Sequence, residues 1–360
     1  MSTNKGYNPR GFRRKDYMAN LSNNYNAIIE YAKDTTNGLD IQYRDNYINI
    51  YYLGGSLLKL SGRGSVAFDK NYYYLPESLD SLRATHIAAL VHKNFRAKVS
   101  ESKTLSRLSE EELMTCKNIA DDINRSLVSS RDNVIKRLKS ANKKEVCSIL
   151  EEMKDQMKRW KDKLRAIGIR KSIADERTVQ HYISLFNKET AADSDFIVID
   201  LEYALSDHSG YCIPPHQKDP NKKQPRIDIV AIEKRTGQLY VLELKYGLKS
   251  TKGDAGVVEH YNDYLKSVGA DDKWLAFWND IDYLVEAQKK DNVLSHDVSL
   301  IKSKPIFGFV YKPEFSENEC NDFNQLLKEK DLSSIMTIYL THSDYAKENP
   351  STKAHVLKKP

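Results

Sequence analysis

The 360-residue sequence predicts a mixed fold of the α+β or α/β class, and three patterns lead to this prediction. Residues 39–68 hold short aromatic and β-branched runs separated by Gly, Asn and Asp, which is typical of a small β-meander. Residues 79–170 contain a single glycine and no proline, and their apolar residues recur every three or four positions, as in helices. After residue 171, helical and strand patterns alternate.

These patterns divide the chain into four parts. We expect a basic arm with a small Tyr-rich β domain at 1–78, a helical and basic region at 79–170, a mixed domain at 171–345 and a tail at 346–360. Within the first part, the patterns predict a helix at 25–33 and strands at 39–43, 47–53, 56–60 and 65–68.

The helical region carries an excess of basic residues. Residues 131–171 hold fourteen Lys and Arg against six Asp and Glu. Their net charge of +8 is larger than the net charge of +6 of the whole chain. Such a segment could lie along a phosphate backbone, and a solvated helical face is the alternative. We call the following candidates for nucleic-acid contact the basic quartet: Lys143, Lys144, Lys158 and Arg159.

The mixed domain has a definite order of predicted elements. A helix at 173–188 is followed by a strand at 196–205, two strands at 227–232 and 239–244, a helix at 255–267 and a strand at 305–311. The order is therefore helix, strand, strand, strand, helix, strand.

The second and third of these strands form a predicted hairpin that carries charged residues. Asp228 lies early in the first run, whereas Glu243 and Lys245 lie late in the second, two residues apart and thus on one face. An antiparallel hairpin brings the three side chains to one end of the sheet. Two carboxylates beside an ammonium suit a hard cation and a group that handles a proton or a phosphate charge.

A structural alternative exists for the same residues. Asp228 could cap a turn, and Glu243 and Lys245 could form a solvated cross-strand pair. Both strands, however, are otherwise close to continuously hydrophobic. A buried charge without a partner is costly, and this favours a functional site.

This arrangement resembles the PD-(D/E)XK nuclease superfamily, whose Asp…Glu-x-Lys triad lies on such a hairpin. Asp228 matches the aspartate, Glu243-Leu244-Lys245 matches the Glu-x-Lys, and the order of elements matches the αβββαβ core of the superfamily. The resemblance implies that Asp228, Glu243 and the Leu244 backbone carbonyl hold Mg²⁺ or Mn²⁺. It also implies that Lys245 positions or deprotonates the attacking water.

Members of this superfamily often add a glutamate from the first core helix or strand, and two positions compete for that role here. Glu202 ends the apolar strand at 196–205, and Glu176 falls on the edge of the apolar face of the preceding helix. Either could instead be a salt-bridge partner. Asp200, which strand alternation places on the same face as Glu202, is a third candidate.

The helix after the hairpin adds further candidates. Its His260 and Tyr264 are four residues apart, where some nuclease subfamilies have Gln-x-x-x-Tyr, so both can face the same way. His260 could orient a catalytic group, contact a phosphate, or be a half-buried helix histidine. Lys249 and Lys252 precede the helix and give a basic approach to its N-terminus, where phosphate binds readily.

Composition and motif content narrow the possible cellular compartment and the possible classes of protein. The sequence has no apolar run of membrane-spanning length and no secretory signal at residues 1–10, so we expect no membrane partner. The four cysteines are far apart and form no CxxC pair, which favours a reducing cytoplasm and excludes a zinc-finger or disulfide framework. No P-loop, GxSxG or HExxH motif occurs.

From the residues and the resemblance together we expect a Mg²⁺- or Mn²⁺-dependent nuclease that hydrolyses DNA. An endonuclease with a defence or restriction-type role is what the resemblance implies. A non-catalytic protein that binds nucleic acid or an assembly partner is the alternative from another class. RNA remains open as a substrate, and a homo-oligomer remains open as the assembly state.

Overall fold

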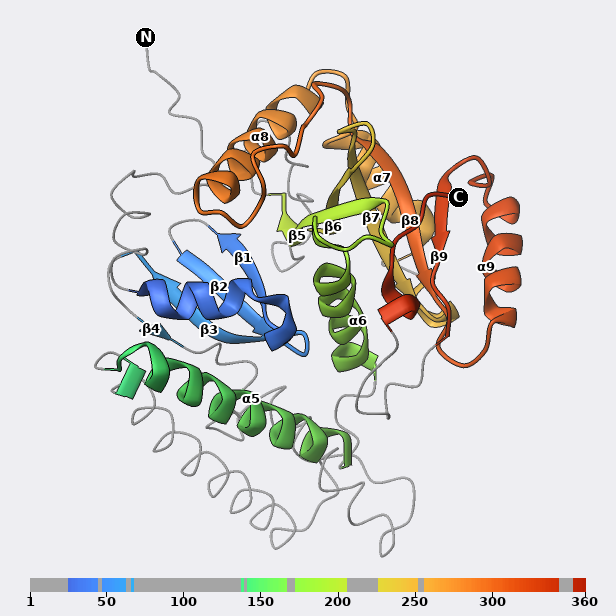
Figure 1. Cartoon of the computed structure of the whole chain (residues 1–360). Helices are drawn as coiled ribbons and strands as arrows, with labels where there is room; N and C mark the ends of the chain where they lie inside the picture. The colour runs from blue at the N-terminus through green and yellow to red at the C-terminus, as the bar shows by residue number, and fades with distance from the viewer. Residues whose placement is uncertain are drawn as a thin grey trace, which may run out of the picture.

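The computed structural model describes residues 25–44, 47–62, 66–67, 137–138, 141–166, 172–205, 226–251, 256–342 and 352–360 (Figure 1). The fold is mixed α+β and contains two sheets. A four-stranded sheet has the order β1-β2-β3-β4, and a five-stranded sheet has the order β5-β6-β7-β8-β9.

The first sheet is an antiparallel meander, as the sequence predicts. Its strands are β1 (Asp40–Arg44), β2 (Tyr47–Tyr52), β3 (Gly55–Ser61) and the short β4 (Val66–Ala67). Residues 25–33 form the predicted helix, which packs on this sheet through buried apolar side chains.

Helix α5 (Lys143–Ala166) lies along the β-meander (Figure 1). Its Val146, Ile149, Leu150, Met153 and Met157 are buried in the same apolar cluster as the meander strands, at the three- and four-residue spacing of one helix face. The helical pattern of 131–171 is confirmed for this stretch. Residues 1–24, which include the expected basic arm, and residues 79–136 of the predicted helical region lie outside the described residues.

The second sheet forms from the mixed domain. Its elements are, in chain order, α6 (Ser172–Phe186), β5 (Phe196–Ala204), β6 (Arg226–Glu233), β7 (Leu239–Tyr246), the short η3 turn (Leu248–Thr251), α7 (Val257–Lys266), α8 (Trp274–Lys290), β8 (Ile306–Lys312), α9 (Asn318–Glu329) and β9 (Met336–Tyr339). β5, β6 and β7 are antiparallel neighbours, whereas β7, β8 and β9 run parallel.

The predicted order of helix, three strands, helix and strand is confirmed in this part of the chain. Three further elements, α8, α9 and β9, were not predicted. α8 lies between α7 and β8, and α9 connects β8 to the edge strand β9 as the crossover that two parallel strands need.

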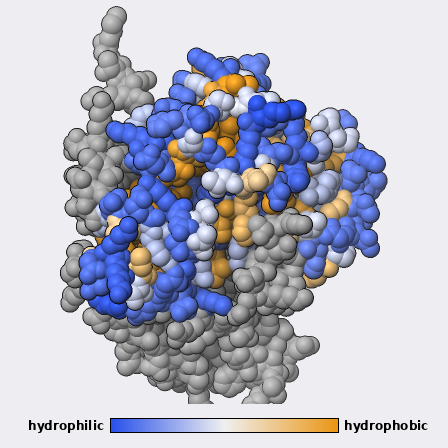
Figure 2. Space-filling view, viewed as in Figure 1, coloured by the Kyte–Doolittle hydropathy of each residue, from blue (hydrophilic) through white to orange (hydrophobic). Residues whose placement is uncertain are grey.

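Helices cover both faces of the five-stranded sheet, which explains why its strands are apolar on both sides. Val179 and Ile183 of α6 pack on one face together with Leu357. Apolar residues of α7, α8 and α9 pack on the other face, in a cluster that continues into the β-meander. On the side seen in Figure 2, hydrophilic residues cover most of the described surface, and apolar ones show in between them near the middle of the view.

Residues 352–360, at the end of the segment expected to be a tail, pack on the mixed domain. The Leu357 side chain is fully buried, its amide donates to Asn187, and its carbonyl accepts from the Asp195 amide. Lys359 forms an ion pair with Glu233. Among the described helices, none has the length and apolar character needed to cross a membrane.

Candidate functional site

The candidate site lies where the β6–β7 hairpin opens. The two strands are paired from Ile232–Leu239 to Ile229–Leu242, and no further pair follows toward the open end. Asp228 and Glu243 occupy the first position beyond the last pair. The strands therefore separate just where the two carboxylates face each other.

Asp228 fills the opening between the strands. Its Oδ2 accepts a hydrogen bond of 2.9 Å from the Leu244 amide, which takes the place of a strand-to-strand bond. Its Oδ1 accepts one of 3.2 Å from the Gln180 side chain of α6. A strand residue directs its amide and carbonyl to the same neighbour, so the Leu244 carbonyl also faces this opening.

Glu243 and Lys245 lie together on the β7 face that α7 covers. Their side chains are only 7% and 2% exposed, and Nζ of Lys245 lies 3.1 Å from Oε1 of Glu243. His260 of α7 reaches the same oxygen, with Nδ1 at 2.9 Å. The structure thus brings together the three residues of the predicted triad and the candidate His260.

The two central carboxyl groups respond to this environment in opposite ways. Burial raises the pKa of Asp228 well above its usual value, and the charges of Glu243 and Glu202 raise it further. Burial also acts to raise the pKa of Glu243, but Lys245 and His260 outweigh it and lower that pKa to about 2. The Asp228 side chain also contributes to lowering the pKa of Glu243.

Both accessory glutamates lie near the triad. Glu202 stands opposite Asp228 in the β5–β6 register, between the pairs Leu201–Ile229 and Tyr203–Ile227. Its carboxylate lies 2.8 Å from the guanidinium of Arg226.

Glu176 lies one helical turn before Gln180 on α6. Burial raises the pKa of Glu176, and among the nearby charges Lys245 lowers it while Glu243 and Glu202 raise it. The geometry therefore does not choose between Glu202 and Glu176, because both carboxylates belong to one electrostatic cluster.

Asp200, the third candidate, has a different place. It is buried and forms an ion pair of 2.5 Å with Arg44 of β1. Strand alternation predicts that Asp200 and Glu202 share a face, but β5 shifts register between Val198 and Asp200, and Glu202 has a φ of 52°. Asp200 pairs with Arg44 and Glu202 pairs with Arg226, so the two carboxylates have different surroundings.

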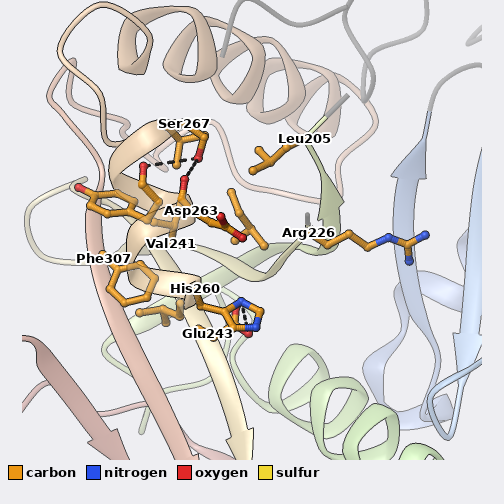
Figure 3. A pocket seen from close by; sticks show the side chains of 12 residues that line it. Leu205, Arg226, Val241, Glu243, His260, Asp263, Ser267 and Phe307 are labelled. Carbon is orange, nitrogen blue, oxygen red and sulfur yellow. Dashed lines mark hydrogen bonds and ion pairs between the residues drawn. The ribbon is translucent and has the colours of Figure 1, made fainter. Parts of the chain in front are cut away.

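A pocket between the β6–β7 hairpin and α7 leads to Glu243 (Figure 3). Glu243 and His260 lie side by side at one end, and Arg226 extends away from them. Tyr264 also lines the pocket, but its hydroxyl donates to the Pro305 carbonyl at 2.7 Å. His260 and Tyr264 therefore share a pocket, with only His260 bound to the triad.

The predicted nucleic-acid contacts fall into two groups. Lys143 and Lys144 are exposed at the start of α5, on the side of the β-meander, and Lys158 is half-buried further along the helix. Lys249 is exposed in η3, directly after β7. Lys252 and the side chain of Arg159 lie outside the described residues.

The oxygen donors at the opening suit Mg²⁺ or Mn²⁺. In the described part of the chain, no group of three His, Cys, Asp or Glu side chains is arranged to hold a metal ion. Asp228, Glu243 and the Leu244 carbonyl offer oxygen atoms alone, and Mg²⁺ is commonly held by one or two carboxylates with water completing its ligands. These three residues would hold the ion.

Two contributors to the site were missed in the sequence. Gln180 is an ordinary polar helix residue, and only its spacing of four from Glu176 places it on the same side of α6. Arg226 directly precedes the apolar run of β6 and reads as a strand-flanking charge. The sequence around Gln180 and Arg226 does not reveal their partners, Asp228 and Glu202, because these lie far away in the chain.

Comparison of this chain with models of known protein families, with curated proteins and with solved structures finds no match. The resemblance to the PD-(D/E)XK superfamily therefore rests on the hairpin motif and on the order of the surrounding elements.

Proposed function

We propose that this protein is a metal-dependent nuclease that hydrolyses phosphodiester bonds of DNA. The observation that carries the proposal is the convergence of Asp228, Glu243 and Lys245 at the opening of the β6–β7 hairpin, with the Leu244 amide bound to Asp228. The placement of this hairpin in the order helix, three strands, helix and strand supports it.

The residues of the site divide the work of such a reaction. Asp228 and Glu243, with the Leu244 carbonyl, would hold Mg²⁺, which when bound polarises a phosphate and lowers the pKa of a water molecule. Lys245 offers ammonium hydrogen-bond donors that can hold the attacking water and stabilise the extra negative charge of the pentacoordinate transition state. His260 fixes the orientation of Glu243 by binding Oε1.

One observation favours the non-catalytic alternative. The carboxylates of the site already have protein partners: Oδ1 and Oδ2 of Asp228 accept hydrogen bonds, and Glu243 Oε1 contacts Lys245 and His260. A site satisfied in this way could persist in a protein that binds nucleic acid or an assembly partner without cutting.

Cleavage assays separate the two functions. Wild type and Lys245→Ala are incubated with plasmid, linear and single-stranded DNA and with single-stranded RNA, with Mg²⁺ or with EDTA. We expect wild type to cut DNA only with the metal and Lys245→Ala to be inactive. Nicking of closed plasmid would show endonuclease action, and cleavage of RNA alone would reassign the substrate.

A matched variant controls for loss of charge and for purification artefacts. Glu286 lies exposed on α8 and pairs with Lys289 there, so Glu286→Gln changes a carboxylate outside the site. It should cut like wild type, whereas Glu243→Gln should be inactive. DNA binding by wild type without metal-dependent cleavage would reject the nuclease and favour the non-catalytic function.

A further inference from the structure

The β-meander binds the part of β5 that carries Glu202. The Leu201 amide donates to Oε1 of Gln42 at 3.2 Å and to Oδ1 of Asp200 at 2.8 Å. The Leu201 carbonyl accepts a hydrogen bond of 3.0 Å from Nη2 of Arg44, and Nη1 of the same guanidinium pairs with Asp200. Both backbone groups of Leu201 are therefore bound to side chains of β1.

This contact is buried and charged. Gln42 is fully buried, Asp200 is 1% exposed and Arg44 is 5% exposed. A buried ion pair depends on its geometry, because neither partner can turn to water if the other is moved. The contact therefore fixes the relative position of β1 and β5 more strictly than a surface ion pair would.

The next residue along β5 needs such support. Glu202 has a φ of 52°, in the left-handed region that side chains other than glycine rarely adopt. Apolar neighbours on either side of it, Leu201 and Tyr203, belong to clusters on opposite faces of the sheet. Residues held in such conformations persist only where the surrounding structure fixes them, and they concentrate at functional sites.

The β-meander also binds α6, the other element that reaches the triad. Nε2 of His181 in α6 lies 3.1 Å from the carbonyl of Gly38, two residues before β1, and Lys188, two residues after the end of α6, pairs with Asp40 of β1. α6 and the residues that follow it therefore contact the start of β1, whereas Gln180 of the helix reaches Asp228.

We propose that the β-meander is a positioning element of the nuclease site: Gln42 and Arg44 fix Leu201 so that Glu202 presents its carboxylate beside Asp228. This inference rests on the proposed nuclease function. It assigns the N-terminal sheet a role in building the metal site, in addition to any contact that the meander makes with a substrate.

Isothermal titration calorimetry with Mn²⁺ alone measures the metal affinity, and it tests the inference without any cleavage. Arg44→Lys keeps a positive charge near Asp200 but lacks the planar fork that binds Asp200 and the Leu201 carbonyl together. We expect it to weaken Mn²⁺ binding by about tenfold or more, as loss of an outer partner of a metal site typically does. Glu202→Gln should weaken binding to a similar degree.

A double-mutant cycle then distinguishes positioning from a general structural role. If Arg44 acts through Glu202, Arg44→Lys should cause no further loss of Mn²⁺ affinity in the Glu202→Gln background. Additive losses, or an unchanged affinity in Arg44→Lys, would overturn the inference. Lys33→Gln is the matched control, because Lys33 forms a surface pair with Glu30 in the helix at 25–33.

A second variant covers the case in which Arg44→Lys fails to fold. Replacing Arg44 and Asp200 together by Met and Leu removes the buried pair without leaving an unpaired charge, a change that folded proteins often tolerate. This variant should also bind Mn²⁺ about tenfold more weakly, and wild-type affinity in it would refute the positioning role. Absence of Mn²⁺ binding in wild type would refute the nuclease proposal itself, and the inference with it.

Discussion

The left-handed backbone of Glu202 makes a prediction about stability that is separate from activity. A residue other than glycine pays about 1–2 kcal/mol for this conformation. Glycine avoids that cost but loses about 0.5–1 kcal/mol more conformational freedom on folding than alanine does. Replacing Glu202 by glycine should therefore give a protein about 0.5–1 kcal/mol more stable than the Glu202→Ala variant.

The comparison of these two variants removes the ion pair from consideration. The side chain of Arg226 is 52% exposed, so its ion pair with Glu202 contributes at most about 1 kcal/mol to stability. Neither variant can form this pair, so its contribution cancels when the two variants are compared. Urea unfolding measures the two free energies, with an unchanged slope showing that the unfolded states are comparable. Both variants should lose Mn²⁺ affinity to the same extent.

A control position shares the conformation without sharing the site. Asn292 has a φ of 55° just after α8, and asparagine tolerates this region better than glutamate does. Asn292→Gly should therefore raise the free energy of unfolding, relative to wild type, by less than the difference between Glu202→Gly and Glu202→Ala. A glycine variant at 202 that is less stable than the alanine variant would show that the backbone of Glu202 stores no strain there.

Four further predictions follow from other parts of the molecule. Gly54→Ala should lower the free energy of unfolding by at least about 1 kcal/mol more than Gly38→Ala does. Both glycines have a positive φ, so the backbone strain of alanine is similar at the two positions. A Cβ at Gly54 would lie 2.4 Å from a backbone carbonyl oxygen of α6, whereas the nearest atom to a Cβ at Gly38 is 3.7 Å away. Urea midpoints of the two variants decide this. Asp228→Asn should abolish cleavage, and its melting temperature should be unchanged or higher. The variant keeps an acceptor oxygen and removes a carboxylate that Glu243 repels. Cleavage by this variant would contradict the site. Burial lowers the pKa of Lys312 to about 8, so the unfolded chain binds more protons between pH 8 and 10 and stability rises with pH there. Urea midpoints at pH 7.5 and 9.5 should differ less in that direction in Lys312→Met than in wild type. Replacing the basic quartet by Gln should flatten the salt dependence of DNA affinity by about one unit of slope for each of its residues that touches a phosphate, and an unchanged slope in fluorescence anisotropy would place the DNA surface elsewhere.

The elements predicted best are those whose pattern is local. The β-meander is marked by short β-branched runs and by turns such as that at Gly54, which has the positive φ that favours glycine. The triad could be predicted because alternation along β7 fixes Glu243 and Lys245 on one face, and the hairpin then brings Asp228 to them. Both steps need only neighbouring residues and one turn.

The parts that were missed depend on contacts between distant segments. The bulge in β5 leaves no trace in the sequence, because its strand is apolar on both faces and a register shift does not interrupt the apolar run. In the sequence, Arg44 reads as a turn residue just after a predicted meander strand, yet its partner Asp200 is 156 residues away. A sequence pattern shows that a residue is polar and where it lies on its own element, but it does not show its partner.

The balance of charge at the site argues for a cation as its resident. Asp228, Glu243, Glu202 and Glu176 all influence one another electrostatically, and Lys245 is the ammonium that the first two share. Two of these carboxyl groups have raised pKa values, because holding a proton relieves repulsion and burial. A site selected for stability alone would be better served by apolar side chains of similar size, since buried charges rarely repay their desolvation. An excess of carboxylates around an otherwise apolar hairpin is therefore better explained by a positively charged ligand than by the fold, and this favours the nuclease over the non-catalytic alternative.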